Sequence, residues 1–175
     1  MKIRSAVGIF AFVLVFVPAC AELAMATAVQ LEIPKQGWSI AFDSPALSQP
    51  QESRRGEGEY AFKANSGRFN ISLFVENPGG PGNTHRDCYA FYWAQSGRNP
   101  RIAKDTVQSS ETPRYVRVQY DIVVEFQGQP IRQRHVHYYF TFQQKWVDVH
   151  ISIIAPTKAD EDTFAAFDRS LRYGS

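Results

Sequence analysis

The chain has 175 residues, of which 44% are hydrophobic, 14% aromatic and 21% charged, a composition typical of one globular domain with a full hydrophobic core. Its formal net charge is only +2, and no basic stripe runs along the sequence, which argues against a nucleic-acid-binding protein. The aromatic content and the many β-branched residues favour a sheet-rich fold.

The first 26 residues follow the pattern of a secretory signal peptide. Lys2 and Arg4 form a positive start, and residues 9–17 form an apolar run that is too short to span a bilayer as a permanent helix. The small residues that follow suit a signal peptidase, so the pattern predicts cleavage after Ala21 or Ala26.

A second interpretation of the same leader makes the protein a lipoprotein. Residues 17–20 resemble a bacterial lipobox, in which Cys20 becomes the lipidated first residue. Both interpretations predict export, as a periplasmic or secreted protein or as a membrane-anchored lipoprotein. In both, Cys88 has no cysteine partner within the chain, so we predict no intramolecular disulfide and expect Cys88 to be a small buried core residue.

Alternating apolar and polar residues predict short strands in the first half of the chain. These strands cover residues 29–33, 38–42, 60–64 and 69–75. The stretch 46–58 is polar and contains Gly and Pro, so we predict an exposed loop there. Asn65-Ser-Gly67 is predicted to be the turn of a hairpin.

A helix is predicted after the glycine-rich loop 77–83. Thr84 and Asp87 have the spacing of a capping box, and the segment 97–100 contains the Gly and Pro that end the helix. Cys88 falls on the apolar face of this helix.

The second half is predicted to be mainly strand, followed by a terminal helix. Apolar residues alternate with polar ones over residues 115–126 and 132–154, and a weaker edge strand covers 102–109. Pro156 ends the last strand, and Thr157 begins a helix with one apolar stripe. Residues 28–173 show no linker and no internal repeat, so we predict a single domain.

Two segments carry a resemblance to a known group of proteins. Trp38-Ser-Ile-Ala-Phe-Asp-Ser-Pro45 near the start and Lys145-Trp-Val-Asp-Val-His-Ile-Ser152 near the end, in this order of elements, resemble the PsbP/Mog1-like group, which includes DcrB-type exported bacterial proteins. The resemblance covers residues 28–173 and implies an α+β fold, with an antiparallel sheet flanked by helices in an α-β-α sandwich. It also implies a non-enzymatic accessory role, and its matching residues carry no catalytic residue over to this chain.

The polar face of the hairpin 132–154 gathers three of the chain's four histidines. A turn at residues 144–145 would place His137 diagonal to His150, whereas a turn at 143–144 would place the two directly opposite. Cross-strand neighbours lie about 5 to 7 Å apart, so the two side chains meet in either register. The preceding strand joins the same face if a turn over residues 127–131 brings Asp121 level with His137.

The histidines predict a possible metal site. His135 and His137 on one strand, with His150 on its neighbour, form a pattern that can hold zinc, and the Asp121 carboxylate would then hydrogen-bond to a zinc-bound histidine. This pattern makes a metal-dependent or histidine-based enzyme an alternative hypothesis.

The same strands also predict an aromatic and basic polar face that binds a partner. Tyr and Arg concentrate at interaction hot spots, and the partner would be another envelope or exported protein. The predicted face comprises Tyr115, Arg117, Gln119, Asp121, His135, His137, Tyr139 and His150. Our leading hypothesis is therefore an exported accessory or partner-binding protein without catalytic activity of its own. A small-ligand carrier, with a cavity between sheet and helix under the 77–83 loop, is a further alternative.

Overall fold

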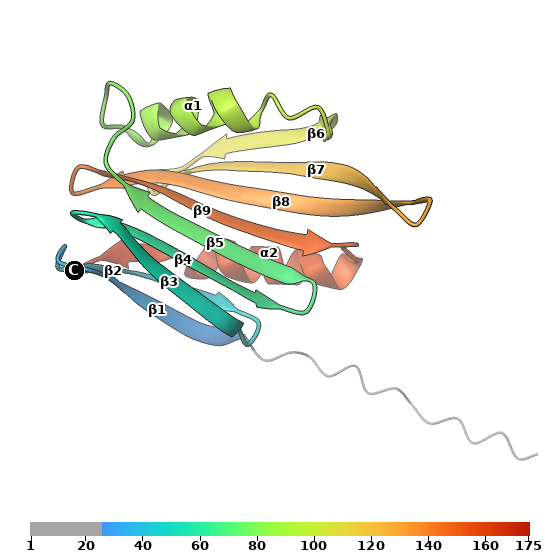
Figure 1. Ribbon diagram of the computed structural model, residues 1–175, viewed down its shortest axis with the longest axis horizontal. Coiled ribbons are helices and arrows are strands. Elements are labelled where there is room, and N and C mark those ends of the chain that lie inside the picture. The colour runs from blue at the N-terminus through green and yellow to red at the C-terminus, as the bar shows by residue number, and fades with distance from the viewer. Residues whose placement is uncertain (1–25) are drawn as a thin grey trace, which may run out of the picture.

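Alternating apolar and polar residues build most strands of a seven-stranded antiparallel sheet, which we call the large sheet. The computed structural model describes residues 26–175, so residues 1–25 of the predicted signal peptide, with the predicted lipidation site at Cys20, lie outside the described residues. Figure 1 shows the large sheet crossing the molecule. Its strands, in spatial order, are β3 (Ser48–Gly56), β4 (Glu59–Ser66), β5 (Phe69–Glu76), β9 (Lys145–Ile154), β8 (Gln129–Phe142), β7 (Val116–Phe126) and β6 (Ile102–Glu111).

A smaller sheet and two helices cover the large sheet. The smaller sheet contains β1 (Thr27–Ile33), β2 (Trp38–Ser44) and β10 (Arg172–Gly174); the sequence analysis did not predict β10. Helix α1 (His85–Ser96) lies on one face of the large sheet, and α2 (Lys158–Ser170) lies with the smaller sheet on the other (Figure 1). We call these the α1 face and the α2 face. The predicted mixed α+β class with mainly antiparallel strands is confirmed.

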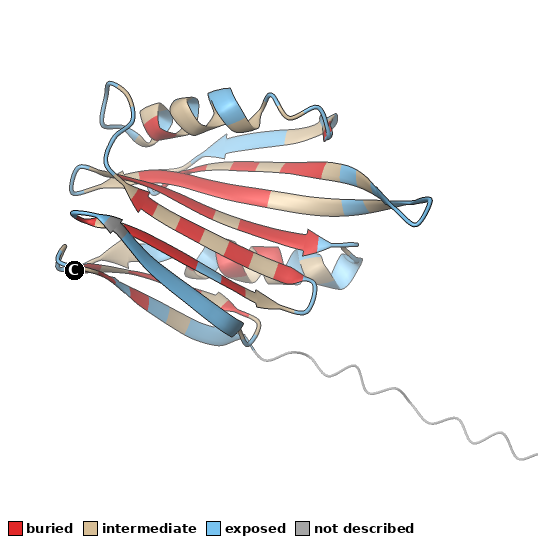
Figure 2. Ribbon diagram, in the orientation of Figure 1, coloured by how far each residue is buried: buried red, intermediate tan, exposed pale blue. Residues whose placement is uncertain are grey.

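Each face of the large sheet carries its own hydrophobic core. The odd-numbered residues of β5 and β9 and the even-numbered residues of β8 point to the α2 face, where they pack against α2 and the smaller sheet. A second core lies under α1, around Cys88, Tyr139 and Trp146. Figure 2 shows the resulting alternation of buried and less buried residues along β5. Cys88 is fully buried, as predicted.

The predicted loop at residues 46–58 is wrong, because most of it forms β3. This strand lies at an edge of the large sheet and, in the described part of the chain, pairs with β4 alone; register shifts next to Gln51 and Gly56 interrupt it. Its residues 48–54 are all exposed. An edge strand can form from backbone hydrogen bonds to one neighbour without an apolar face of its own, which is why hydrophobic periodicity missed it.

The helix signals in the sequence are confirmed. Thr84 caps α1, with its hydroxyl accepting a hydrogen bond from the Asp87 backbone N–H, while Asp87 accepts from the Thr84 backbone N–H. Thr157 precedes α2, where the Asp160 carboxylate accepts from its backbone N–H at 2.6 Å. Among the described residues, neither helix is long and apolar enough to cross a membrane.

Candidate functional site

The turn between β8 and β9 decides how the histidines meet. Gln143 and Gln144 occupy it, both with positive φ angles of 46° and 60°, as a two-residue hairpin turn with primed geometry requires. Phe142 therefore pairs with Lys145, and His137 lies directly opposite His150. Of the two registers that the sequence allowed, the structure has the one with the turn at 143–144.

The third histidine joins the pair diagonally. His135 is opposite Ser152 in the register, but its Nδ1 lies 2.9 Å from Nε2 of His150. The planes of these two rings differ by only 5°. Nδ1 of His150 lies 3.3 Å from the Ser72 hydroxyl on β5. A chain of hydrogen bonds thus runs from His135 through His150 to Ser72.

His137 has different partners. Its Nδ1 lies 2.9 Å from Oδ1 of Asp148 and its Nε2 lies 3.0 Å from the Tyr120 hydroxyl. A carboxylate only accepts hydrogen bonds, so Nδ1–H of His137 donates to Asp148. In the neutral imidazole, Nε2 then accepts from the Tyr120 hydroxyl. Burial raises the pKa of Tyr120 to about 12, and the Asp148 charge adds to this effect.

Burial keeps two of the three imidazoles neutral at pH 7. It lowers the pKa of His135 to about 4, and the neighbouring His137 lowers it further while Asp121 acts in the opposite direction. Burial likewise lowers the pKa of His150 well below the ordinary histidine range, with His137 and His135 as additional causes. The sheet therefore holds His135 and His150 in close contact by keeping these two imidazoles uncharged.

The geometry does not assemble the predicted zinc site. His137 and His150 stack face to face, with ring centroids 4.2 Å apart and planes 12° apart, so their in-plane lone pairs do not converge on one point. The facing nitrogens of His135 and His150 are already hydrogen-bonded to each other. Within residues 26–175, no group of three or more His, Cys, Asp or Glu side chains is placed to hold a metal ion.

The prediction of one continuous polar face is wrong, because the turn between β7 and β8 is shorter than expected. Gln127 and Gly128 form a two-residue turn, so Phe126 pairs with Gln129, and Val118, rather than Asp121, is the partner of His137. A shift of pairing by an odd number of residues moves every side chain of a strand to the opposite face. Asp121 pairs with Arg134, not with His137.

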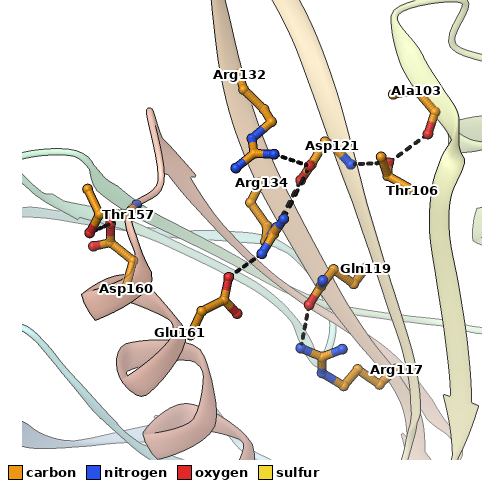
Figure 3. Close-up of polar contacts among 10 residues, drawn as sticks. All are labelled: Ala103, Thr106, Arg117, Gln119, Asp121, Arg132, Arg134, Thr157, Asp160 and Glu161. Atoms are coloured by element: carbon orange, nitrogen blue, oxygen red, sulfur yellow. Dashed lines mark hydrogen bonds and ion pairs between the residues drawn. The ribbon is translucent and has the colours of Figure 1, made fainter.

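The odd-numbered residues of β7 consequently lie on the α2 face, away from the histidines. Arg117 binds Asp168 of α2 through Nε at 2.9 Å and the amide oxygen of Gln119 through Nη2 at 2.9 Å. Asp121 accepts two hydrogen bonds from Arg134 (Figure 3). Tyr115 is buried in the core beside α2.

On the histidine side, the predicted residue Tyr139 is also buried. Its ring stacks on Tyr92 of α1, with planes 11° apart, and on His137 from its own strand. Tyr115, Asp121 and Tyr139 are each no more than 5% exposed, so the sheet and helices cover them on the folded protein.

A groove opens on the α1 face beside the histidines. It has a volume of about 370 Å³ and lies over β3, β4, β5 and β9, with His150 at one side. Its polar lining consists of Gln49, Gln51, Lys63, Asn65, Asn70 and Ser72. This position differs from the cavity predicted under the 77–83 loop, where Gly79 and Gly80 instead pack closely against the rings of Phe91 and Trp146.

Sequence reasoning missed three partners of the histidines, namely Ser72, Tyr120 and Asp148. Ser72 is opposite His150 in the β5–β9 pairing, a long-range contact that no local pattern reveals. Asp148 stands two residues before His150, on the same face of β9, and this spacing was the available signal. Tyr120 is one of the alternating residues of 115–126, and only the β7–β8 pairing shows that it shares a face with the histidines.

Comparisons with known proteins leave the family of this chain open. No protein-family model matches it, and no curated protein matches it. It is similar to a protein from Bacteroides thetaiotaomicron whose crystal structure is known, with a TM-score of 0.41 and 12% sequence identity. The match covers 78% of this chain and 45% of that protein, so the chain spans less than half of its length.

Proposed function

We propose that this chain is an exported accessory protein of PsbP/Mog1-like architecture that acts by binding another envelope or exported protein. The sequence resemblance and the predicted export signal support the compartment and the class. The observation that carries the proposal is a hairpin arm, residues 123–132, which extends past the last pairings of β7 with β6 and of β8 with β9. Figure 1 shows this arm projecting from the large sheet.

Exposed apolar side chains concentrate at this arm. Val123 is 47% exposed and Phe126 is 60% exposed, and Ile154, at the end of β9 beside the arm, is 36% exposed. Within residues 26–175 these are the exposed large hydrophobic side chains. Clustered apolar groups that stay in water cost free energy unless a partner covers them, and such patches mark interaction sites.

The register places most of these apolar residues on one face of the arm. Val124 pairs with Ile131 across the arm. Gln133 pairs with Ile122 of β7 on one side and with Ile154 of β9 on the other. We call the resulting row the apolar strip; it comprises Ile122, Val124, Phe126, Ile131 and Ile154. It lies on the α1 face, continuous with Tyr120 and His135.

On its β9 side, the arm favours a partner that binds side chains rather than one that adds a strand. The carbonyl of Arg132 points to the β9 side of the arm and accepts a hydrogen bond from the backbone N–H of Ala155. The next residue with its backbone on that edge is Pro130, which has no N–H to donate. Proline at such a position blocks strand addition. The apolar strip on this projecting arm suits a protein with a concave apolar groove, into which Phe126 inserts.

A photocrosslinking residue at position 126 tests this proposal in the native envelope. We expect a specific adduct whose partner residues line an apolar groove, and no adduct when the same crosslinker replaces Lys158, an exposed residue at the start of α2. The purified partner should bind Phe126→Ser at least ~10-fold more weakly, which corresponds to about 1.4 kcal/mol. Equal adducts at both positions, or unchanged affinity of Phe126→Ser, would refute the proposal.

The zinc alternative has its own test. Elemental analysis of the purified protein, together with His137→Ala, decides whether the histidines hold metal. Stoichiometric zinc that is lost in this variant would favour the metal-dependent enzyme over the accessory role.

A further inference from the structure

Among the described residues, the groove beside His150 is lined by one cation and several neutral donors. Lys63, Ser72 and His150 are successive partners across β4, β5 and β9 in the register. None of its described lining residues is acidic, and Lys63 has no carboxylate of residues 26–175 within ion-pair distance. Its ammonium group lies 5.8 Å from the ring centroid of Phe74, another lining residue. The groove therefore has a positive charge that the described part of the chain does not neutralise.

The histidine chain turns the Ser72 hydroxyl into a donor toward the groove. Nε2 of His135 is buried and has no hydrogen-bond partner within residues 26–175. If Nδ1–H of His135 donates to Nε2 of His150, then Nε2 of His135 carries no proton and only its lone pair is unpaired. If Nε2–H of His150 donates to His135 instead, then Nε2 of His135 carries a proton, and this buried N–H has no acceptor. Buried unpaired N–H groups are the rarer case in proteins. His150 then donates through Nδ1–H to the Ser72 oxygen, and the Ser72 proton is left for a ligand.

The amide side chains complete this arrangement. The side-chain oxygen of Asn65 accepts a hydrogen bond from the Ser48 hydroxyl at 3.0 Å, which leaves its NH2 group available to the groove. Gln49 and Gln51, on β3, offer further amides along the rim. An ammonium, a hydroxyl and amide N–H groups together complement an oxyanion, while amides also pair with hydroxyl groups.

We propose that this groove binds a small polar carboxylic acid, with its carboxylate between Lys63 and Ser72 and its remaining polar groups on the amides of β3 and β4. One lysine balances one negative charge, so the site suits a carboxylate better than a doubly charged phosphate. The volume of about 370 Å³ is at the lower end of the ~300–1,000 Å³ found for small-molecule sites. This site lies away from the arm tip and does not depend on the partner proposed above.

Binding measurements with matched probes test this site. The acids are D-glucuronate and N-acetyl-L-alanine, and their neutral counterparts are D-glucose and N-acetyl-L-alaninamide. We expect at least one acid to shift the backbone resonances of Ser72 and Lys63 in ¹H–¹⁵N NMR spectra, with at least ~10-fold higher affinity than its neutral counterpart. D-glucose 6-phosphate should bind more weakly than D-glucuronate.

Variants assign the effect to the groove. Lys63→Met should weaken binding of the acid at least ~10-fold, and Ser72→Ala should weaken it several-fold. Lys158→Met removes a lysine from α2 on the other face of the sheet and should leave binding unchanged. The proposal is wrong if neither acid binds at 10 mM, if the neutral analogues bind equally well, if the phosphate binds more tightly, or if Lys63→Met has no effect.

Discussion

At the scale of single residues, His137 shows how a polar group is accommodated inside this sheet. It is 6% exposed, yet both ring nitrogens are satisfied, one by Asp148 and one by Tyr120. A buried polar group with all its hydrogen bonds made costs little, whereas the same group with one partner removed is expensive. The His137–Asp148 hydrogen bond therefore affects the stability of the fold mainly because removing one partner leaves the other buried without a hydrogen bond.

This argument predicts the effect of Asp148→Ala. The substitution leaves Nδ1–H of His137 buried without an acceptor, so we expect the free energy of unfolding to fall by about 2 kcal/mol. Chemical denaturation measures this change, and Asp105→Ala, an exposed aspartate on β6, is the matched control with an expected change below about 0.5 kcal/mol. Equal effects of the two substitutions would contradict the assigned hydrogen bond.

The buried imidazoles also predict a pH dependence. The pKa of His135 is about 4 in the folded protein against an ordinary value of 6.5, and that of His150 is lowered as well. Between pH 6.5 and pH 4 the unfolded chain therefore binds protons that the folded chain does not bind. The free energy of unfolding consequently falls as pH decreases from about 6.5 toward 4. His135 alone accounts for a loss on the order of 3 kcal/mol by the low end of this window.

Unfolding measurements between pH 7 and pH 4 check this expectation. Other groups also titrate in this range, so the informative quantity is the difference between the wild type and His135→Gln. We expect the variant to lose less stability on acidification than the wild type does. Parallel curves for the two proteins would show that His135 is not held neutral by the fold.

At the scale of secondary-structure elements, charged pairs fasten α2 to the large sheet. The side chain of Asp121 is 3% exposed, and its partner Arg134 also pairs with Glu161 of α2. Figure 3 shows this bridge from β7 through β8 to the helix. Farther along α2, Asp168 binds Arg117 and accepts from the Tyr138 hydroxyl at 2.5 Å. These contacts orient a helix whose apolar residues Phe164 and Phe167 supply the packing.

Substitution of the two acidic partners of Arg134 should lower the stability of the protein by very different amounts. Asp121→Asn breaks a buried ion pair and should destabilise the protein by about 3 kcal/mol. Glu161→Gln removes a carboxylate that is 51% exposed, and should cost less than about 1 kcal/mol because water screens it. Denaturation of both variants under the same conditions tests the ranking, and a larger loss for Glu161→Gln would reverse our account of the bridge.

At the scale of the whole molecule, stability should be distributed unevenly over the large sheet. The central strands β5, β9 and β8 have both edges paired and contribute to the main core. The edge strand β3 is exposed along residues 48–54, and no third strand of residues 26–175 lies beside the arm residues 123–132. Regions with few buried contacts open at lower free-energy cost than the core.

Hydrogen exchange should therefore rank these regions. We expect backbone amides of β5, β9 and the paired part of β8 to exchange slowest, near the global unfolding rate, and those of β3 and the arm tip to exchange fastest. Mass spectrometry of peptides from each strand provides the measurement. Protection of the arm equal to that of β9 would indicate that the free arm is covered, for example by self-association.

The sequence by itself determined which segments alternate apolar with polar residues, where the helices are capped and which residues form the main core. These features depend on neighbours within a few residues, as with Thr84 and Asp87 or with the apolar residues of β8 and β9. For the same reason, the sequence narrowed the register of His137 against His150 to two alternatives, because one short turn sets this register.

Only the tertiary structure decided which chemical groups meet. The turn at Gln127 and Gly128 reversed the face on which Asp121 lies, since strand side chains have a period of two and one residue of slip exchanges the faces. The pairing of β5 with β9 brought Ser72 to His150 across 78 residues of sequence. Backbone hydrogen bonding to a neighbour likewise made a strand of the polar segment 48–56. The groove, the neutral imidazoles and the apolar strip depend on these long-range pairings, which local residue patterns do not encode.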